Sequence, residues 1–264
     1  MRLATLVDGT CVAVDGDGYA PLPGKLVDHL QRPLLAETLG RRPISEARFG
    51  PPLRPPKVIC LGLNYADHIE ESGQARPERP LLFSKLPSTV IGQGQLILRP
   101  QGATKLDYEA ELAVVIGRPG RHIAPENANS HIGGYACFND VSEREAQLTD
   151  GQWFRGKSFA TFGPLGPFIV TGDELEDPHA LDITCTVNGE VRQQSNTRHL
   201  VFQIPEIIAF CSRSFELEPG DVIATGTPGG VGLASGRWLV PGDVVEVSIA
   251  GIGTLRNEVG EAPS

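Results

Sequence analysis

Three acidic residues alternate with other residues where an apolar segment begins. These are Asp107, Glu109 and Glu111, at the start of residues 107–115. In a β-strand, side chains two residues apart share a face, so the three carboxylates would lie together. Two carboxylates ~4 Å apart repel each other by about 4 kcal/mol at an effective dielectric constant of 20. A hard divalent cation, which takes oxygen ligands, would remove this repulsion. A solvated edge strand is the alternative.

A second apolar segment, residues 133–140, ends abruptly in the carboxylate of Asp140. Functional sites are often built at such strand ends. Arg144 and Gln147 follow four and seven residues later, a spacing that aligns all three on one helical face. The alternative for Asp140 is a structural one, in which its side chain caps the helix that follows.

Two further candidates could act on a substrate. Lys157 follows a glycine and precedes Ser158-Phe159, a partly apolar setting in which a charged ammonium would stabilise an enolate or a carboxylate. His68 and Glu71 are three residues apart and would face each other on a helical turn, as a general base and the carboxylate that orients it. A surface helix with one histidine among several acids is the alternative. The polar residues 71–80 that follow could form a lid.

A glycine-rich loop, residues 225–232, follows a short apolar segment. Its backbone N–H groups could cradle an anion. The loop lacks the Gly-Lys-Ser/Thr of a P-loop and the spacing of a dinucleotide-binding motif, so a substrate carboxylate fits better than a nucleotide. The chain also lacks Gly-x-Ser-x-Gly, which argues against a serine hydrolase of the α/β class.

The elements that must position these residues are mostly strands. Strands are predicted over residues 57–63, 80–84, 111–117, 133–140, 166–172, 182–194, 221–226 and 243–259, with a hairpin turn at Asn188-Gly189. Helices are predicted after Asn64, over residues 142–148 and over residues 205–213. Strands and long helices do not alternate regularly, which argues against a Rossmann or TIM arrangement and favours an α+β, predominantly β fold.

The N-terminal region has its own pattern. Short β-prone runs within residues 1–22 predict a small antiparallel sheet, and a helical stretch follows over residues 26–38. Five of the fifteen residues 43–57 are proline, which excludes a helix or a central strand. We therefore predict a small N-terminal domain over residues 1–50, a proline-rich linker over 51–56 and a catalytic domain over 57–264.

Composition limits the possible partners. The 264 residues include 23 Lys and Arg against 32 Asp and Glu, a net charge of −9 without any basic run, which argues against nucleic acid and membrane surfaces as partners. No segment reaches the ~20 apolar residues of a membrane span, and no signal peptide is evident, so we expect a cytoplasmic protein. The five cysteines are widely spaced and odd in number, which predicts reduced, buried thiols.

Taken together, the motifs resemble those of the fumarylacetoacetate hydrolase family. The resemblance covers residues 57–259 and rests on five ordered motifs: Asn64-Tyr65-x-x-His68-x-x-Glu71, Asp107-Tyr108-Glu109-x-Glu111-Leu112, Asn139-Asp140-Val141-Ser142-x-Arg144-x-x-Gln147, Gly156-Lys157-Ser158-Phe159 and Thr225-Gly226-Thr227-Pro228-x-Gly230-Val231-Gly232. It implies a mixed β-roll of stacked sheets with few helices, and a homodimer.

The resemblance also implies roles for these residues. Glu109, Glu111 and Asp140 would bind one Mg²⁺ or Mn²⁺. Contacts to a metal-chelating 2-oxo acid substrate would come from Arg144, Gln147, Lys157, Gly226 and Thr227. His68 and Glu71 match a lid dyad that activates water, and Lys85 matches a recurrent lysine.

These roles predict a metal-dependent hydrolase that cleaves acylpyruvate-type 2,4-dioxo acids into pyruvate and a carboxylic acid. The same metal, by withdrawing electrons from the 2-oxo acid, would serve a decarboxylase or an isomerase. Their substrates would be oxaloacetate-like or hydroxymuconate-like diacids, such as those of aromatic catabolism. A non-enzymatic alternative is a small-anion-binding protein that the metal stabilises.

Overall fold

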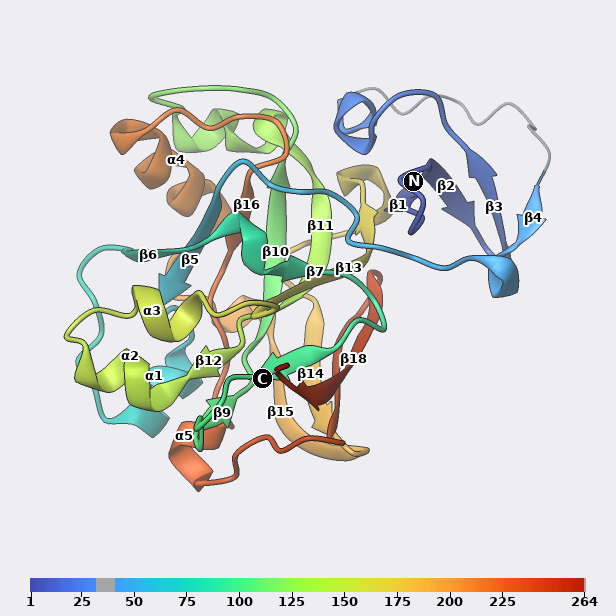
Figure 1. Ribbon diagram of the computed structural model, residues 1–264. Coiled ribbons are helices and arrows are strands. Elements are labelled where there is room, and N and C mark those ends of the chain that lie inside the picture. Colours follow the sequence, from blue (N-terminus) through green and yellow to red (C-terminus); the bar gives the residue numbers. More distant parts are fainter. Residues whose placement is uncertain (32–40, 264) are drawn as a thin grey trace.

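The computed structural model describes residues 1–31 and 41–263. Within them, the largest sheet has eleven strands in the order β4-β3-β2-β1-β13-β11-β10-β16-β5-β6, with β7 paired to β13 (Figure 1). In chain order, its strands are β1 (Arg2–Thr5), β2 (Cys11–Asp15), β3 (Gly18–Pro21), β4 (Arg42–Pro43), β5 (Val58–Gly62), β6 (Leu81–Lys85), β7 (Val90–Ile91), β10 (Ala110–Ile116), β11 (Ile132–Asn139), β13 (Gly163–Val170) and β16 (Val222–Ala224).

A second sheet of five strands packs against the middle of the first one. Its order is β15-β14-β17-β18-β8, and it contacts β10, β11 and β13. The strands are β8 (Ile97–Arg99), β14 (Asp182–Val187), β15 (Glu190–Asn196), β17 (Val244–Ile249) and β18 (Gly253–Glu261), and a separate short pair joins β9 (Leu106–Asp107) to β12 (Ser142–Glu143). This stacked, predominantly β architecture confirms the predicted fold class.

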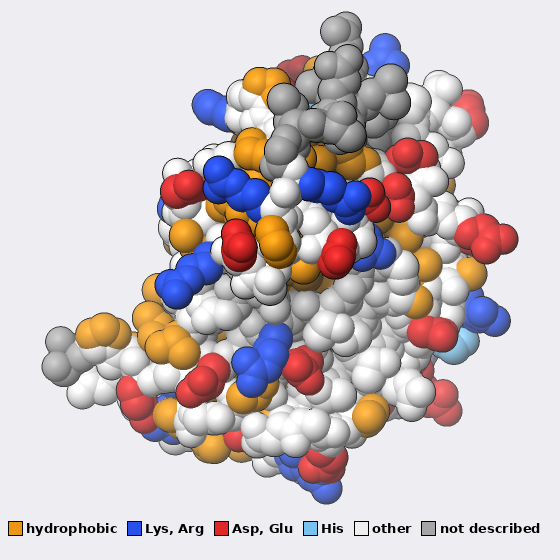
Figure 2. All heavy atoms as spheres, turned by 90° about the vertical axis from the view of Figure 1, so that its right-hand side faces the viewer, with side chains coloured by type: hydrophobic (Ala, Val, Ile, Leu, Met, Phe, Trp, Pro, Cys, Tyr) orange, Lys and Arg blue, Asp and Glu red, His pale blue; other side chains and the backbone are white. Residues whose placement is uncertain are grey.

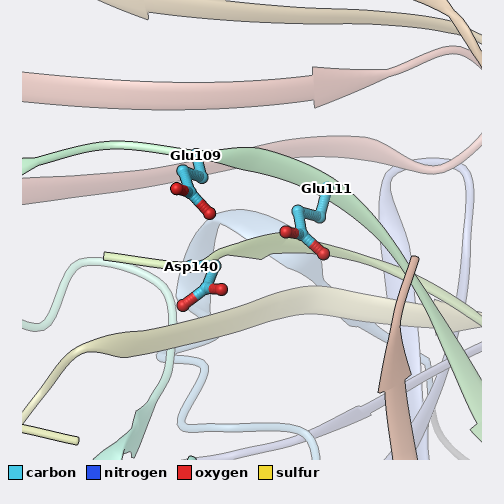
Figure 3. A group of neighbouring side chains, drawn as sticks. All are labelled: Glu109, Glu111 and Asp140. Atoms are coloured by element: carbon cyan, nitrogen blue, oxygen red, sulfur yellow. The ribbon is translucent and has the colours of Figure 1, made fainter. Parts of the chain in front are cut away.

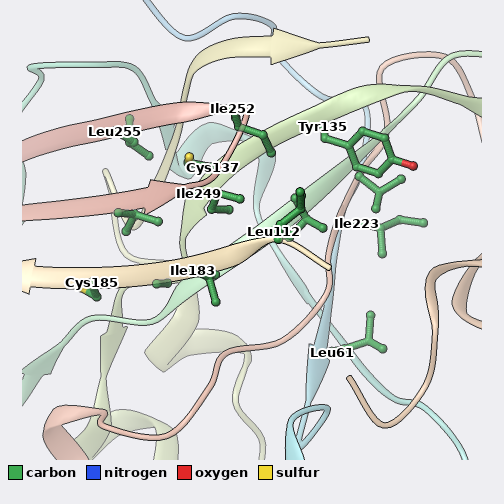
Figure 4. Close-up of a cluster of buried hydrophobic side chains, with 14 of the residues drawn as sticks. Leu61, Leu112, Tyr135, Cys137, Ile183, Cys185, Ile223, Ile249, Ile252 and Leu255 are labelled. Atoms are coloured by element: carbon green, nitrogen blue, oxygen red, sulfur yellow. The ribbon is translucent and has the colours of Figure 1, made fainter. Parts of the chain in front are cut away.

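The main hydrophobic core lies between the two sheets. Leu112 and Tyr135 from the large sheet meet Ile183, Ile249 and Leu255 from the smaller one (Figure 4). Every residue of β10 is buried. Such a strand reads as a continuous apolar run rather than an alternating one. This is why the apolar stretch after Glu111 predicted the strand correctly.

The predicted hairpin joins β14 and β15. Asn188 and Gly189 have φ angles of 53° and 79°. Both positive values are those of a type I′ turn, for which Asn-Gly is the preferred sequence. The hairpin prediction is therefore confirmed.

Short helices cover the ends of the strands. They are α1 (Ala66–Ser72), α2 (Arg144–Thr149), α3 (Phe154–Lys157), α4 (Ile204–Ser214) and α5 (Gly232–Ser235). The predicted helices after Asn64, over 142–148 and over 205–213 correspond to α1, α2 and α4. Of the stretch predicted over 26–38, residues Leu26–His29 form a 3₁₀ helix and residues 32–38 lie outside the described residues. Among the described helices, none has the length and apolarity of a membrane span.

The N-terminal strands β1 to β4 pair in antiparallel order, as predicted. They are not a separate sheet, because Arg2 of β1 pairs with Val170 of β13 and so continues the large sheet. The division into domains at residues 51–56 stays a prediction. Figure 2 shows this side of the molecule, on which Lys and Arg side chains lie among Asp and Glu side chains.

All five cysteines are free and buried. Burial raises the pKa of each thiol, for example that of Cys11 to about 11 and that of Cys137 to about 12. The prediction of buried thiols is thus confirmed.

Candidate active site

The pairing of β10 with β11 brings the three acidic residues together. Ala110, the first residue of β10, pairs with Asn139, the last residue of β11, so Glu109 and Asp140 lie side by side just beyond the ladder. The backbone N–H of Asp140 donates to the carbonyl of Glu109 at 2.9 Å. One carboxylate oxygen from each of Glu109, Glu111 and Asp140 lies within 4.8 Å of the others, and the three side chains are close neighbours (Figure 3).

Asp107 does not join this group, contrary to the expectation that it shares a face with Glu109. Strand β9 ends at Asp107, so the two-residue alternation is broken before β10 begins. The Asp107 carboxylate instead accepts a hydrogen bond from Arg144 Nε at 2.7 Å and one from the backbone N–H of Gly232 at 2.7 Å. Its position indicates that it orients Arg144.

Three buried cations surround the acidic group. Lys157 Nζ donates to Glu109 Oε2 at 2.7 Å and to Asp140 Oδ2 at 2.9 Å. Arg144 Nη2 lies 2.6 Å from Glu109 Oε1, and Lys85 Nζ donates to Asp140 Oδ1. Buried charges persist only when they are paired in this way. Of these cations, the sequence indicated a buried setting only for Lys157.

The carboxylates differ in their electrostatic setting. Burial raises the pKa of Glu109, but the charges of Lys157 and Arg144 outweigh it and hold that pKa at about 2. Glu111 has no lysine at hydrogen-bond distance. Burial and the charges of Asp140 and Glu109 raise its pKa well above the ordinary value.

A divalent cation fits this donor set. Glu111 Oε1 is buried and makes no hydrogen bond to any of the described residues, while its other oxygen accepts from a backbone N–H. An orphaned buried carboxylate oxygen beside two further carboxylates is an oxygen-rich environment of the kind that Mg²⁺ and Mn²⁺ prefer. The four buried carboxylates of Asp107, Glu109, Glu111 and Asp140 outnumber the cations of Lys85, Arg144 and Lys157 by one, so the residues present suit such an ion.

Helix α2 begins at Arg144, and the residue that caps it is Glu143. The Glu143 side chain accepts hydrogen bonds from the backbone N–H groups of Glu145 and Ala146. The structural alternative for Asp140, a helix cap, is therefore wrong, because Asp140 lies before β12 and points into the acidic group. Arg144 Nη1 donates to Gln147 Oε1 at 2.8 Å, so these two are brought together on α2. Asp140 lies before the helix, so the predicted alignment of all three on one helical face is wrong.

Helix α1 carries His68 and lies over the site. His68 Nδ1 lies 3.6 Å from Glu71 Oε2, which is too long for a hydrogen bond. Glu71 instead accepts from the backbone N–H of Gly230 at 3.0 Å, and Asp67 accepts from Ser195 Oγ at 2.6 Å. These contacts fix α1 to the glycine-rich loop and to β15.

The glycine-rich loop cradles carboxylates, but those of the protein itself. The backbone N–H of Gly226 donates to Glu111 Oε2 at 2.8 Å, and that of Gly232 donates to Asp107. The N–H of Gly226 is thus already occupied. Thr227 is the loop residue that lines the cavity beside the acidic group, and its hydroxyl donates to the carbonyl of Ala110 at 2.9 Å.

Gln193 is a site residue that sequence reasoning missed. It is buried on β15, where its amide donates to Thr227 Oγ1 and to the carbonyl of Pro228, both at 2.8 Å, and accepts from the N–H of Ala110 at 2.9 Å. Gln193 thereby fixes the loop against β10. A polar residue within a predicted strand carries no signal of such a role, because its partners are more than thirty residues away.

A cavity of about 210 Å³ opens beside the acidic group. Its polar lining includes side chains predicted for the site, namely His68, Glu109, Arg144, Gln147, Lys157 and Thr227. Leu61, Leu63, Phe83, Leu148, Trp153 and Leu233 supply an apolar wall. The cavity therefore combines buried cations and carboxylates with an apolar surface on a scale that suits a small molecule.

The fold thus combines stacked sheets with a carboxylate-lined cavity whose acidic group could hold a metal ion. The family model "Fumarylacetoacetate (FAA) hydrolase C-terminal" matches residues 57–260, and the chain belongs to the fumarylacetoacetate hydrolase family. The resemblance inferred from the sequence motifs is therefore confirmed.

Three relatives illustrate the range of the family. Oxaloacetate tautomerase Fahd2a of Rattus norvegicus, a mitochondrial protein, is 42% identical over 260 residues, which is 93% of this chain and 83% of that protein. A 5-carboxymethyl-2-hydroxymuconate delta-isomerase from Mycobacterium smegmatis has 37% identity and a TM-score of 0.87 over 99% of this chain and 100% of its own. Maleylpyruvate hydrolase from Sphingobium sp. SYK-6, in complex with manganese(II) and pyruvate, has 30% identity and a TM-score of 0.86 over both complete chains.

Proposed function

We propose that this protein is a divalent-metal-dependent enzyme that interconverts the keto and enol forms of a short 2-oxo acid, with oxaloacetate as the substrate. The observation that carries the proposal is the meeting of Glu109, Glu111 and Asp140 within 4.8 Å beside a small cavity. The similarity of the chain to an oxaloacetate tautomerase, over 93% of its length, supports this choice of substrate.

The acidic group would hold the metal, and the cations would hold the substrate. Glu109, Glu111 and Asp140 would bind Mg²⁺ or Mn²⁺, which when bound supplies a Lewis acid for the carboxylate and the C2 oxygen of a 2-oxo acid. Lys157 and Arg144 remain protonated, because the charges of their carboxylate partners outweigh burial and raise the pKa of each. They are thus available to stabilise negative charge on the substrate.

His68 is the base in this proposal. It takes a proton from C3 of the keto form, the electron pair of the C3–H bond becomes the C2=C3 double bond, and the C2 oxygen gains the negative charge. A proton added to that oxygen completes the enol, and the reverse sequence returns the keto form. Lys157 stabilises the oxyanion, and α1 with its carboxylate anchors keeps His68 over the cavity.

The test is the ketonisation of freshly dissolved enol-oxaloacetate, followed by the loss of its ultraviolet absorbance. Wild-type protein with Mg²⁺ should accelerate this step, and chelator-treated protein should not. His68→Ala should lower kcat by about 10²–10⁴-fold while the affinity for oxalate is kept. Equal rates with and without metal would refute the proposal.

Hydrolysis of acylpyruvates is the second candidate, and the observation that favours it is the position of Glu71 next to His68. A movement of less than 1 Å would make their 3.6 Å separation a hydrogen bond, and such a dyad activates water. Water would attack the distal carbonyl, the C3–C4 bond would break, and pyruvate and a carboxylic acid would form.

The products that form from each substrate distinguish the candidate reactions. Acetylpyruvate that yields pyruvate marks hydrolysis, oxaloacetate that releases CO₂ marks decarboxylation, and a change in absorbance without new fragments marks isomerisation. If no substrate is turned over while Glu109→Gln lowers the melting temperature, the protein is the metal-stabilised, anion-binding alternative. We also propose a homodimer in the cytoplasm, and sedimentation equilibrium tests the oligomeric state.

A further inference from the structure

A second cavity adjoins the substrate cavity and is larger. Its volume is about 510 Å³, against about 210 Å³ for the substrate cavity. Phe83 and Trp153 line both of them. The acidic group and the substrate-binding cations adjoin only the smaller cavity, whereas Leu81, Leu82 and Phe154 line the larger one. The two aromatic side chains therefore stand between the cavity that holds the acidic group and a second, more open one.

The rings of Phe83 and Trp153 are in edge-to-face contact. Their centroids are 5.3 Å apart and their planes meet at 74°. This geometry is a favoured one for aromatic pairs, and it contributes about 0.5–1.5 kcal/mol beyond the burial of area. The pair is thus a defined partition rather than a chance approach of two side chains.

Trp153 is held in place from a second side by Gly62. A Cβ atom built on Gly62 would lie 2.4 Å from Cζ3 and 2.7 Å from Cη2 of Trp153. The indole therefore rests directly on the backbone at the end of β5, where a side chain would push it away. The absence of a Cβ at this position permits the indole to close the cavity.

The partition is also linked to the substrate-binding end. Lys157 Nζ lies 5.0 Å from the centroid of the Phe83 ring, within the range of a cation–π interaction. The backbone N–H of Lys157 donates to the carbonyl of Trp153 at 3.0 Å. Trp153 caps the start of α3 and Lys157 is its last residue, so this short helix links the indole to the ammonium group that contacts Glu109 and Asp140.

We infer that Trp153, packed on Phe83 and Gly62, is the residue that limits the length of the substrate. It closes the cavity at its apolar end and restricts the enzyme to short 2-oxo acids, while the larger, more open cavity behind it would accept an aromatic or aliphatic tail if the indole were removed. This inference rests on the proposed function, because it assumes that the head of a 2-oxo acid binds at Lys157 and the acidic group.

The test compares the binding of two probes that the enzyme cannot hydrolyse. Oxalate represents the carboxylate and the C2 oxygen alone, and 2-oxo-4-phenylbutanoate adds an aromatic tail. Dissociation constants are measured by titration calorimetry in the presence of Mn²⁺ for wild-type protein, Trp153→Ala, Trp153→Phe and Phe154→Ala. Phe154 is the matched control, because it is the next residue, is 43% exposed and lines only the larger cavity.

In wild-type protein, we expect oxalate to bind more tightly than the phenyl compound. Trp153→Ala should narrow this difference by at least tenfold through tighter binding of the phenyl compound, with oxalate affinity within about threefold of wild type. Trp153→Phe and Phe154→Ala should keep the wild-type ratio. If Trp153→Ala does not fold, Trp153→Leu opens the wall in part and should shift the ratio in the same direction.

Other outcomes separate the inference from the proposed function. If wild-type protein binds oxalate but the ratio does not change in Trp153→Ala, the inference is wrong and the proposed function stands. If Trp153→Ala loses oxalate binding, Trp153 positions Lys157 rather than closing the cavity, and the inference is again wrong. If wild-type protein with Mn²⁺ binds neither probe, the proposed function itself fails.

Discussion

Replacement of Lys85 by methionine removes one cation from a fully buried group of charges. The side chains of Lys85 and Asp140 are both 0% exposed, and the ammonium also donates to the carbonyl of Val141 at 2.9 Å. Loss of one partner of a buried ion pair costs about 3–5 kcal/mol, because the other charge stays buried. Asp140 keeps its contact with Lys157, so we expect the lower end, about 3 kcal/mol.

For a chain of this size, about 3 kcal/mol corresponds to a fall in melting temperature of about 6–12 °C. The free energy of unfolding is measured by urea unfolding, which is followed by tryptophan fluorescence and by circular dichroism. A chelator is present so that metal binding does not contribute. Methionine matches lysine in length and fills the same apolar space.

Arg155→Met is the matched control, because it also removes one cation of an ion pair. Arg155 is 59% exposed where it meets Asp150, and surface pairs of this kind contribute little. Its unfolding midpoint should stay at the wild-type value. The double variant Lys85→Met with Asp140→Asn should be more stable than Lys85→Met alone, because no uncompensated charge remains. Equal midpoints for Lys85→Met and Arg155→Met would refute this account of the buried charges.

Three further predictions concern the metal, the helices and the thiols. A divalent metal at a hundred times its dissociation constant should stabilise wild-type protein by about 2.7 kcal/mol in thermal melts, whereas Glu111→Gln should fold but show no such shift; equal shifts would exclude Glu111 as a ligand. Gly156→Ala should destabilise the protein by about 1–3 kcal/mol in urea and weaken oxalate binding, because the new Cβ would lie 2.5 Å from the backbone N of Gln147; wild-type stability would show that α2 and α3 separate freely. A thiol reagent at neutral pH should label none of the five cysteines in native protein and all five in denaturant, since burial raises their pKa values and blocks access; labelling of Cys11 before unfolding would contradict this.

Most strands and three helices were predictable because their signals are local. An apolar run such as Val114 to Ile116, an Asn-Gly turn and a proline in the first turn of α4 each act through neighbouring residues. Asp107 shows the limit of such signals. Its alternation with Glu109 predicted a common face, but the chain leaves the strand between them, and Arg144 takes the carboxylate.

The roles of the residues around the acidic group depended on contacts between segments that are distant in the chain. Lys85, the last residue of β6, and Asp140, which follows β11, are 55 residues apart in the chain, and only the fold brings their side chains into contact. The loop N–H groups, expected to bind a substrate anion, are instead paired with internal carboxylates such as Glu111. No local pattern indicated that Trp153 lines the cavity, because it lies in a polar loop without hydrophobic periodicity.

The amino-acid sequence by itself indicated most of the side chains that meet at the site: the carboxylates Glu109, Glu111 and Asp140, the cations Arg144 and Lys157, and His68. These follow from residue type and local spacing together with the family resemblance of the motifs. Only the tertiary structure decided how the charges are partnered, which N–H groups remain for a ligand and where the cavity ends. Those properties depend on strand order and on the packing of Trp153 against Gly62, 91 residues away in the chain, and no local pattern encodes them.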